Sequence, residues 1–147
     1  MLVKKFKISD AGCEAIYFDK KETEVYIKTK EQPLISLIDS FAKLEKYVIE
    51  ICELHKDAKI EVTGLSLSFN HDVRGAVIVA KMNLARSTGV VNLVTPHRIE
   101  KFYGETGDSG QLMPPGMIDD VTNAIIEIEK YIYGERAGKQ EELFNAA

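Results

Sequence analysis

The sequence has few residues that could crosslink the chain or hold a metal. Its two cysteines, Cys13 and Cys52, are too few for a disulfide framework, and we expect both to behave as small buried apolar side chains. The three histidines lie far apart, and no CxxC, HExxH or comparable spacing occurs. The sequence therefore predicts neither a structural zinc site nor any other cofactor.

Long apolar runs and an excess of positive charge are also missing. No stretch approaches the roughly 18 apolar residues of a membrane helix, and the first ten residues lack the apolar core of a signal peptide. The formal net charge of −4 is unfavourable for a surface that follows a nucleic-acid backbone. We therefore expect a soluble, cytoplasmic protein that binds neither a membrane nor a nucleic acid.

Recognisable catalytic motifs are absent as well. The sequence contains no GxSxG and no GxxxxGK(S/T) motif. The glycines of GETGDSG do not lie between a predicted strand and a helix at the spacing of a dinucleotide-binding fold. Adjacent carboxylates such as Asp119 and Asp120 point in different directions on a helix, so they form no acid–base pair by themselves. We therefore expect a binding protein and not an enzyme.

Length and composition are those of one globular domain. The chain has 147 residues, of which 45% are hydrophobic and 29% charged, so it can bury a core without crosslinks. No linker and no internal repeat divides it. We place a single domain at residues 1–134 and a C-terminal tail at residues 135–147.

Alternation of apolar and polar residues predicts a sheet with one solvent-facing side. The segment 59–69 changes phase at Gly64, which indicates a β-bulge. The segment 75–80 (GAVIVA) is apolar on both sides, so we expect a central strand covered on both faces. The expected strands lie near residues 6–8, 16–18, 23–30, 59–69, 75–84 and 90–94.

Apolar residues at steps of three and four predict two helices. One extends from Pro33 to Cys52, and the other from Ile118 to Ile132, with Gly134 at its end. Residues 99–116 are rich in Gly and Pro and predict a long irregular loop. The order β-β-β-α-β-β-β-α describes an α+β domain, a mostly antiparallel sheet with two amphipathic helices. Either the helices cover opposite faces of the sheet, or a second copy of the chain covers one face.

Residues suited to an anionic, aromatic ligand meet at one end of the expected sheet. If segment 59–69 pairs with 75–84, and 75–84 with 90–95, the loop at 70–74 and the exit of the last strand lie together. Arginine binds phosphate through a planar fork and an aromatic ring stacks on a base, so this end predicts a site for a nucleotide-like ligand. Alternatively, these charged loop ends are only solvated. The candidate ligand-binding residues are Phe69, His71, Arg74, Asn92, Thr95, His97 and Arg98.

The tail contains a second candidate site. Gln140, Leu143 and Phe144 form a QxxLF pattern in QEELF. It is similar to the short peptide by which many bacterial and phage proteins dock on the replicative sliding clamp, where Leu and Phe fill an apolar pocket and Gln makes an orienting hydrogen bond. Alternatively, Leu143 and Phe144 pack on the domain as a final helical turn.

The layout as a whole resembles small phage-encoded proteins. The features are the N-terminal strand pairs, TPH at 95–97, the Gly-rich loop with QLMPP at 111–115, the segment GERAGKQ and the QxxLF end. Among such proteins it resembles the Thoeris anti-defence sponge family, whose members bind cyclic-ADP-ribose-type signals between subunits without cleaving them. The resemblance implies a homo-oligomer whose pocket is lined by Arg74, Asn92, Thr95, His97 and Arg98.

Three hypotheses follow for the function. The first is a non-enzymatic oligomeric protein that sequesters a nucleotide-derived signal. The second is an accessory protein of phage replication or recombination that docks on the sliding clamp. The third is an enzyme for a small phosphorylated substrate, with His71 or His97 as acid or base beside a carboxylate such as Asp72 or Asp108.

Overall fold

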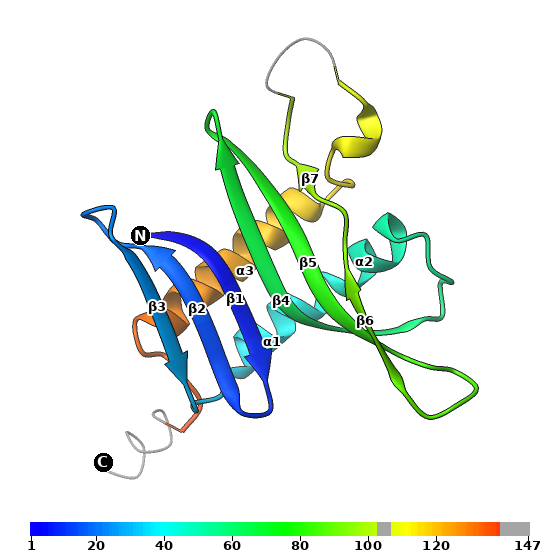
Figure 1. The fold of residues 1–147 in the computed structure, drawn as a ribbon, viewed down its shortest axis with the longest axis horizontal. Helices are drawn as coiled ribbons and strands as arrows, with labels where there is room; N and C mark the ends of the chain where they lie inside the picture. Colours follow the sequence, from blue (N-terminus) through cyan, green and yellow to red (C-terminus); the bar gives the residue numbers. More distant parts are fainter. Residues whose placement is uncertain (103–106, 139–147) are drawn as a thin grey trace.

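The computed structural model describes residues 1–102 and 107–138, which form one sheet with helices on one side (Figure 1). The strands follow the order β3-β2-β1-β4-β5-β6, and β7 pairs with β5 beyond β6. The pairings between these strands are antiparallel, which confirms the predicted α+β class. The elements are β1 (Leu2–Ser9), β2 (Gly12–Phe18), β3 (Glu24–Thr29), α1 (Ile35–Ala42), α2 (Glu45–Ile51), β4 (Lys59–Asn70), β5 (Val73–Asn83), β6 (Val90–Val94), β7 (Arg98–Ile99), the 3₁₀ helix η1 (Ser109–Gln111) and α3 (Met117–Ile132).

The sheet consists of two meanders joined by a short pairing. The first contains β1, β2 and β3, and the second contains β4, β5 and β6. Between the two, β1 pairs with β4 only from Lys5 to Lys7, opposite Ser66 to Gly64. Beyond this pairing the two strands diverge, as Figure 1 shows.

The β4–β5 hairpin has the turn and the bulge that its sequence favours. His71 and Asp72 occupy the turn with φ angles of 51° and 62°, as a two-residue type I′ turn requires. The register shifts between Val62 and Gly64, so the predicted bulge is confirmed. The shift restores the buried phase, and Ile60, Val62, Leu65 and Leu67 all reach the core.

The helices lie together behind the sheet in Figure 1, on one face. α1 packs against α3, and both contact the sheet together with α2. The prediction allowed helices on opposite faces or a partner over one face. The helices leave the second face open, although β5 is an inner strand as expected.

The first predicted helix is interrupted, which corrects the single helix expected from Pro33 to Cys52. It divides into α1 and α2 at Lys43 and Leu44, where hydrogen bonds tighten to i→i+3 spacing. Leu44 stays fully buried at the break. The apolar stripe is therefore continuous although the helix axis is not, and the periodicity alone did not reveal the break.

The core lies between the helices and the covered face of both meanders. The ring of Phe6 in β1 packs edge-on against Phe41 of α1 and Tyr131 of α3, with centroid distances of 6.0 and 5.2 Å. Cys13 is buried in β2, whereas Cys52 caps α2 and is half-buried. Gly134, with φ of 106°, follows the end of α3 as predicted.

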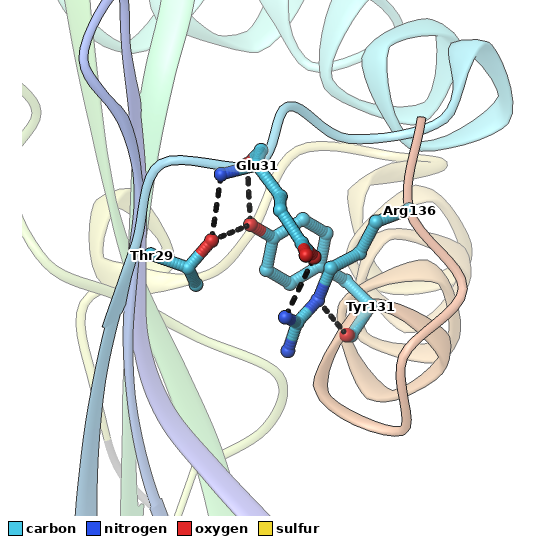
Figure 2. Close-up of polar contacts among 4 residues, drawn as sticks. All are labelled: Thr29, Glu31, Tyr131 and Arg136. Atoms are coloured by element: carbon cyan, nitrogen blue, oxygen red, sulfur yellow. Dashed lines mark hydrogen bonds and ion pairs between the residues drawn. The ribbon is translucent and has the colours of Figure 1, made fainter. Parts of the chain in front are cut away.

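The folded domain continues past the predicted boundary at residue 134. The backbone N–H of Ala137 donates to the carbonyl of Gln32 at 3.0 Å. Figure 2 shows Arg136 bonded to the carboxylate of Glu31 at 2.8 Å and to the carbonyl of Tyr131 at 2.9 Å. The first part of the predicted tail is therefore attached to the domain, and residues 139–147 lie outside the described residues.

Candidate functional site

The topology brings several predicted site residues to one end of the sheet. Phe69 pairs with Arg74 beside the β4–β5 turn. After β6, the chain passes Pro96 and pairs again with β5 through β7, where Arg98 lies opposite Ala76. His71, His97 and Arg98 therefore occupy the same end, but alternation along the strands distributes the side chains over both faces.

Arg74 lies on the helix face, where it ties the sheet to α3. Its guanidinium forms an ion pair with Glu100 and donates to the hydroxyl of Thr122 at 2.6 Å. It also reaches the carbonyl of Ile118 at 3.4 Å. Because these contacts neutralise and occupy Arg74, its main role is to hold β5 and α3 together.

Arg98 borders a cleft of about 540 Å³ between the end of α2 and the segment that carries η1. This volume lies within the usual range for small-molecule sites. The guanidinium donates to the carbonyl of His97 at 3.0 Å, but it forms no ion pair with residues 1–102 or 107–138. Burial raises the pKa of the Cys52 thiol, and the positive charge of Arg98 lowers it by a smaller amount.

The rest of the cleft combines carboxylates with apolar side chains. Glu50 and Glu53, both exposed, line one wall at the end of α2. Leu112, Met113 and the Pro114–Pro115 pair contribute apolar surface from the loop. None of these lining residues was among the predicted site residues, because nothing in the sequence indicates that the end of α2 and the loop at 109–115 lie together.

The opposite face of the same sheet end contains a hydrogen-bonded Ser–His pair. Ser68 Oγ lies 2.7 Å from His97 Nε2. The imidazole passes over Gly75, where a Cβ atom would lie 2.2 Å from Nε2. Gly75 is therefore needed for this contact, which the sequence analysis did not predict. Both side chains are exposed, and the described residues contain no ion pair between His97 and a carboxylate.

The remaining predicted residues have diverse environments. Thr95 is buried, and its Oγ1 accepts the backbone N–H of Ile78 at 2.9 Å, which commits the hydroxyl to the sheet. Asn92 is exposed at the middle of β6. His71 is exposed at the hairpin turn, and Phe69 is 44% exposed on the helix face beside Arg74. The structure therefore does not gather all seven residues around one ligand.

Two further cavities lie away from this end. One of about 250 Å³ occupies the gap between β1 and β4 and is closed behind by Phe41 of α1. Glu45 and Glu61 both line it, and burial together with the charge of Glu61 raises the pKa of Glu45. The other is a largely apolar cavity of about 550 Å³ near Leu54 and Met82. The carboxylates of Glu45 and Glu61 disfavour a phosphate in the first cavity. The second cavity is lined by Arg86 but by none of the predicted site residues.

The open face of the sheet is more basic than the chain as a whole. The strand register and the Lys4 contacts place six lysines and three glutamates there, although the net charge of the chain is −4. Because the net charge averages over all surfaces, it does not reveal this segregation of lysines on one face. The residues are Lys4, Lys5, Lys7, Lys28, Lys59 and Lys81 with Glu14, Glu24 and Glu61.

Other classes of site have little support in the described part of the chain. Residues 1–102 and 107–138 contain no group of three or more His, Cys, Asp or Glu side chains placed to hold a metal ion. Among the same residues, no helix has both the length and the apolar character needed to cross a membrane. The predicted clamp-docking residues Gln140, Leu143 and Phe144 lie outside the described residues.

Comparison of the chain with protein family models, curated proteins and solved structures found no match.

Proposed function

We propose that the protein binds a nucleotide-like anion without converting it, and that several copies of the chain associate. The proposal rests on Arg98, which borders a ligand-sized cleft without an ion-pair partner among the described residues. Arg74 and Arg136, by contrast, are each paired with a glutamate. A guanidinium that the fold leaves without a carboxylate is available to bind a phosphate in bidentate fashion.

The other lining groups match the remaining parts of a nucleotide. Carboxylates such as Glu50 and Glu53 accept hydrogen bonds from ribose hydroxyls, as acidic residues do in dinucleotide sites. Leu112 and Met113 provide apolar surface for a base. Exposed glutamates beside a single arginine favour a ligand with few phosphates and several hydroxyls over a triphosphate.

The ligand class that we propose is a cyclic-ADP-ribose-type signal, sequestered in the cytosol as a phage counter-defence. This part of the proposal is supported by the resemblance to the sponge family and by the match between cleft and ligand chemistry. Sequestration of the ligand requires no catalytic group. The exposed Ser68–His97 pair lies on the opposite face of the sheet from the cleft.

Native mass spectrometry and calorimetry with a panel of cyclic nucleotides and ADP-ribose isomers test the proposal. We expect one panel member to bind and to be recovered with unaltered mass. Arg98→Gln should weaken binding by about 10- to 100-fold, the loss of hydrogen bonds to a charged group. Arg86→Gln, which changes an exposed arginine of the β5–β6 connection, is the matched control and should bind like the wild type.

Three results would overturn the proposal. They are conversion of the ligand, equal affinities of Arg98→Gln and the wild type, and no binding across the panel at millimolar concentration. Circular dichroism of each variant verifies that a loss of binding is not a loss of folding.

The alternative proposal is docking on the bacterial sliding clamp through Gln140, Leu143 and Phe144. Arg136 and Ala137 attach the chain to the domain immediately before this segment, so a peptide that follows has a fixed origin. Immobilised clamp should bind the wild type, and the double change of Leu143→Ala with Phe144→Ala should abolish binding. Unchanged binding of the double variant, or no binding of the wild type, would exclude this function.

A further inference from the structure

The two edges of the sheet differ in how they are protected. β3 forms one edge, and its sequence EVYIKT includes Glu24 and Lys28, the kind of charges that discourage pairing with another strand. β6 forms the other edge, and its sequence VVNLV has no charge and no proline. Val90, Val91 and Val94 are 54%, 38% and 66% exposed. An uncharged, apolar edge of this kind is a template for a further strand.

The hydrogen bonds of β6 to β5 determine which backbone groups remain at the outer edge. Thr95 N donates to Ile78 O and Leu84 N donates to Gly89 O, so these are hydrogen-bonded pairs of the ladder. Alternate residues follow the same pattern, which directs the N–H and C=O of residues 91 and 93 towards β5. The N–H and C=O groups of Val90, Asn92 and Val94 therefore point away from the sheet.

This pattern is self-complementary. If β6 of a second copy lies antiparallel with Asn92 opposite its own counterpart, Val90 lies opposite Val94 and Val91 opposite Leu93. The three outward-facing residues of one copy then lie opposite the three of the other. Each of the three pairs can exchange two backbone hydrogen bonds, about six in all. Side chains also match, since valines face valines on the open side and the two Asn92 amides can bond to each other.

We propose that two copies of the chain associate through β6 into one continuous sheet with this register. The proposal rests on the association of copies in the proposed function and adds the surface that mediates it. The two-fold axis is perpendicular to the sheet, so the basic open faces of both copies lie on the same side. The interface is separate from the Arg98 cleft, so that dimerisation and ligand binding can fail independently.

Charge exchange at Asn92 tests the register. Asn92→Lys and Asn92→Glu each place like charges opposite each other across the axis, so each should weaken dimerisation at least about tenfold. An equimolar mixture of the two variants should recover a heterodimer, because Lys then faces Glu. The assay is sedimentation velocity with light scattering, in which the wild type should have twice the 16.5 kDa mass of the chain or an even multiple of it.

Tyr26→Lys is the matched control, because it adds an exposed lysine to the opposite edge strand and should leave the mass unchanged. A wild type that is monomeric at about 100 µM, well above the dissociation constant of a stable dimer, would refute the proposal. So would two charge variants that dimerise like the wild type, or single variants that dissociate without recovery in the mixture. If the wild type is dimeric but binds no ligand of the panel, only the proposed function is refuted.

Discussion

The hydroxyl of Tyr131 joins the C-terminal helix to the loop after β3, and we predict that Tyr131→Phe destabilises the fold measurably. The hydroxyl donates to the carbonyl of Glu31 and lies 3.3 Å from Thr29 Oγ1 (Figure 2). Tyr131 is 1% exposed and Glu31 is half-buried, so water replaces the lost hydrogen bond at the carbonyl of Glu31 only in part. The phenyl ring of the variant keeps the edge-on packing against Phe6.

The expected loss of stability follows from the burial of this hydroxyl. Loss of one partner from a buried hydrogen bond costs about 1–3 kcal/mol, and we expect about 1.5 kcal/mol because Glu31 is only half-buried. With a urea m value of about 1.5–2 kcal/mol/M, the midpoint of unfolding should fall by about 0.8–1 M. Tyr133→Phe is the matched control, because Tyr133 follows the same helix and is 73% exposed.

Urea unfolding monitored by far-ultraviolet circular dichroism measures the effect, since the chain has no tryptophan. A Tyr131→Phe midpoint within about 0.2 M of the wild type, less than a typical single contact contributes, would refute the reasoning. Burial also raises the pKa of Tyr131 from 10.0 to about 12. Its neutral form therefore stabilises the fold below pH 10, and this contribution is lost as the pH rises towards 12. The difference between the variant and the wild type should decrease over that range.

Three further predictions concern the sheet and the cavity between β1 and β4. Gly12→Ala should destabilise by about 3 kcal/mol in urea unfolding, because Gly12 has φ of +128° and a Cβ atom would lie 1.9 Å from the carbonyl oxygen of Thr29; a loss below about 1 kcal/mol would contradict this. Thr95→Val should cost about 1–3 kcal/mol because it leaves the buried N–H of Ile78 without an acceptor, and Thr95→Ser should restore most of the loss. Burial raises the folded pKa of Glu45, so ionisation lowers stability as the pH rises through that value; Glu45→Gln should be the more stable protein at pH 7, and equal melting temperatures at pH 7 would count against it.

Local sequence patterns were sufficient to predict most of the strands and helices. Alternation indicated the strands, and the phase change at Gly64 indicated the bulge, because both depend on a period of two within one segment. Gly134 ended α3 for an equally local reason, since its φ of 106° suits glycine. The break between α1 and α2 was missed because the apolar stripe is continuous across it and gives no signal in the periodicity.

The candidate site depended on longer-range features. His97 and Arg98 lie at the end of the sheet that the predicted strand pairing indicates, but neighbouring residues of a strand point to opposite faces. His97 therefore meets Ser68 on the open face, whereas Arg98 reaches the cleft beside α2. Glu50 joins that cleft only because α2 ends beside the loop that carries η1.

The sequence by itself determined the strands, the helical segments, the turns and the joining of two strand exits at one end of the sheet. Each of these depends on backbone preferences and apolar periodicity within a few residues. Only the tertiary structure decided that the helices share one face, that Glu100 neutralises Arg74 while Arg98 has no ion-pair partner among the described residues, and that β6 is an unprotected edge. These outcomes depend on contacts between segments far apart in the chain, and such contacts leave no periodic signal in the sequence of either segment.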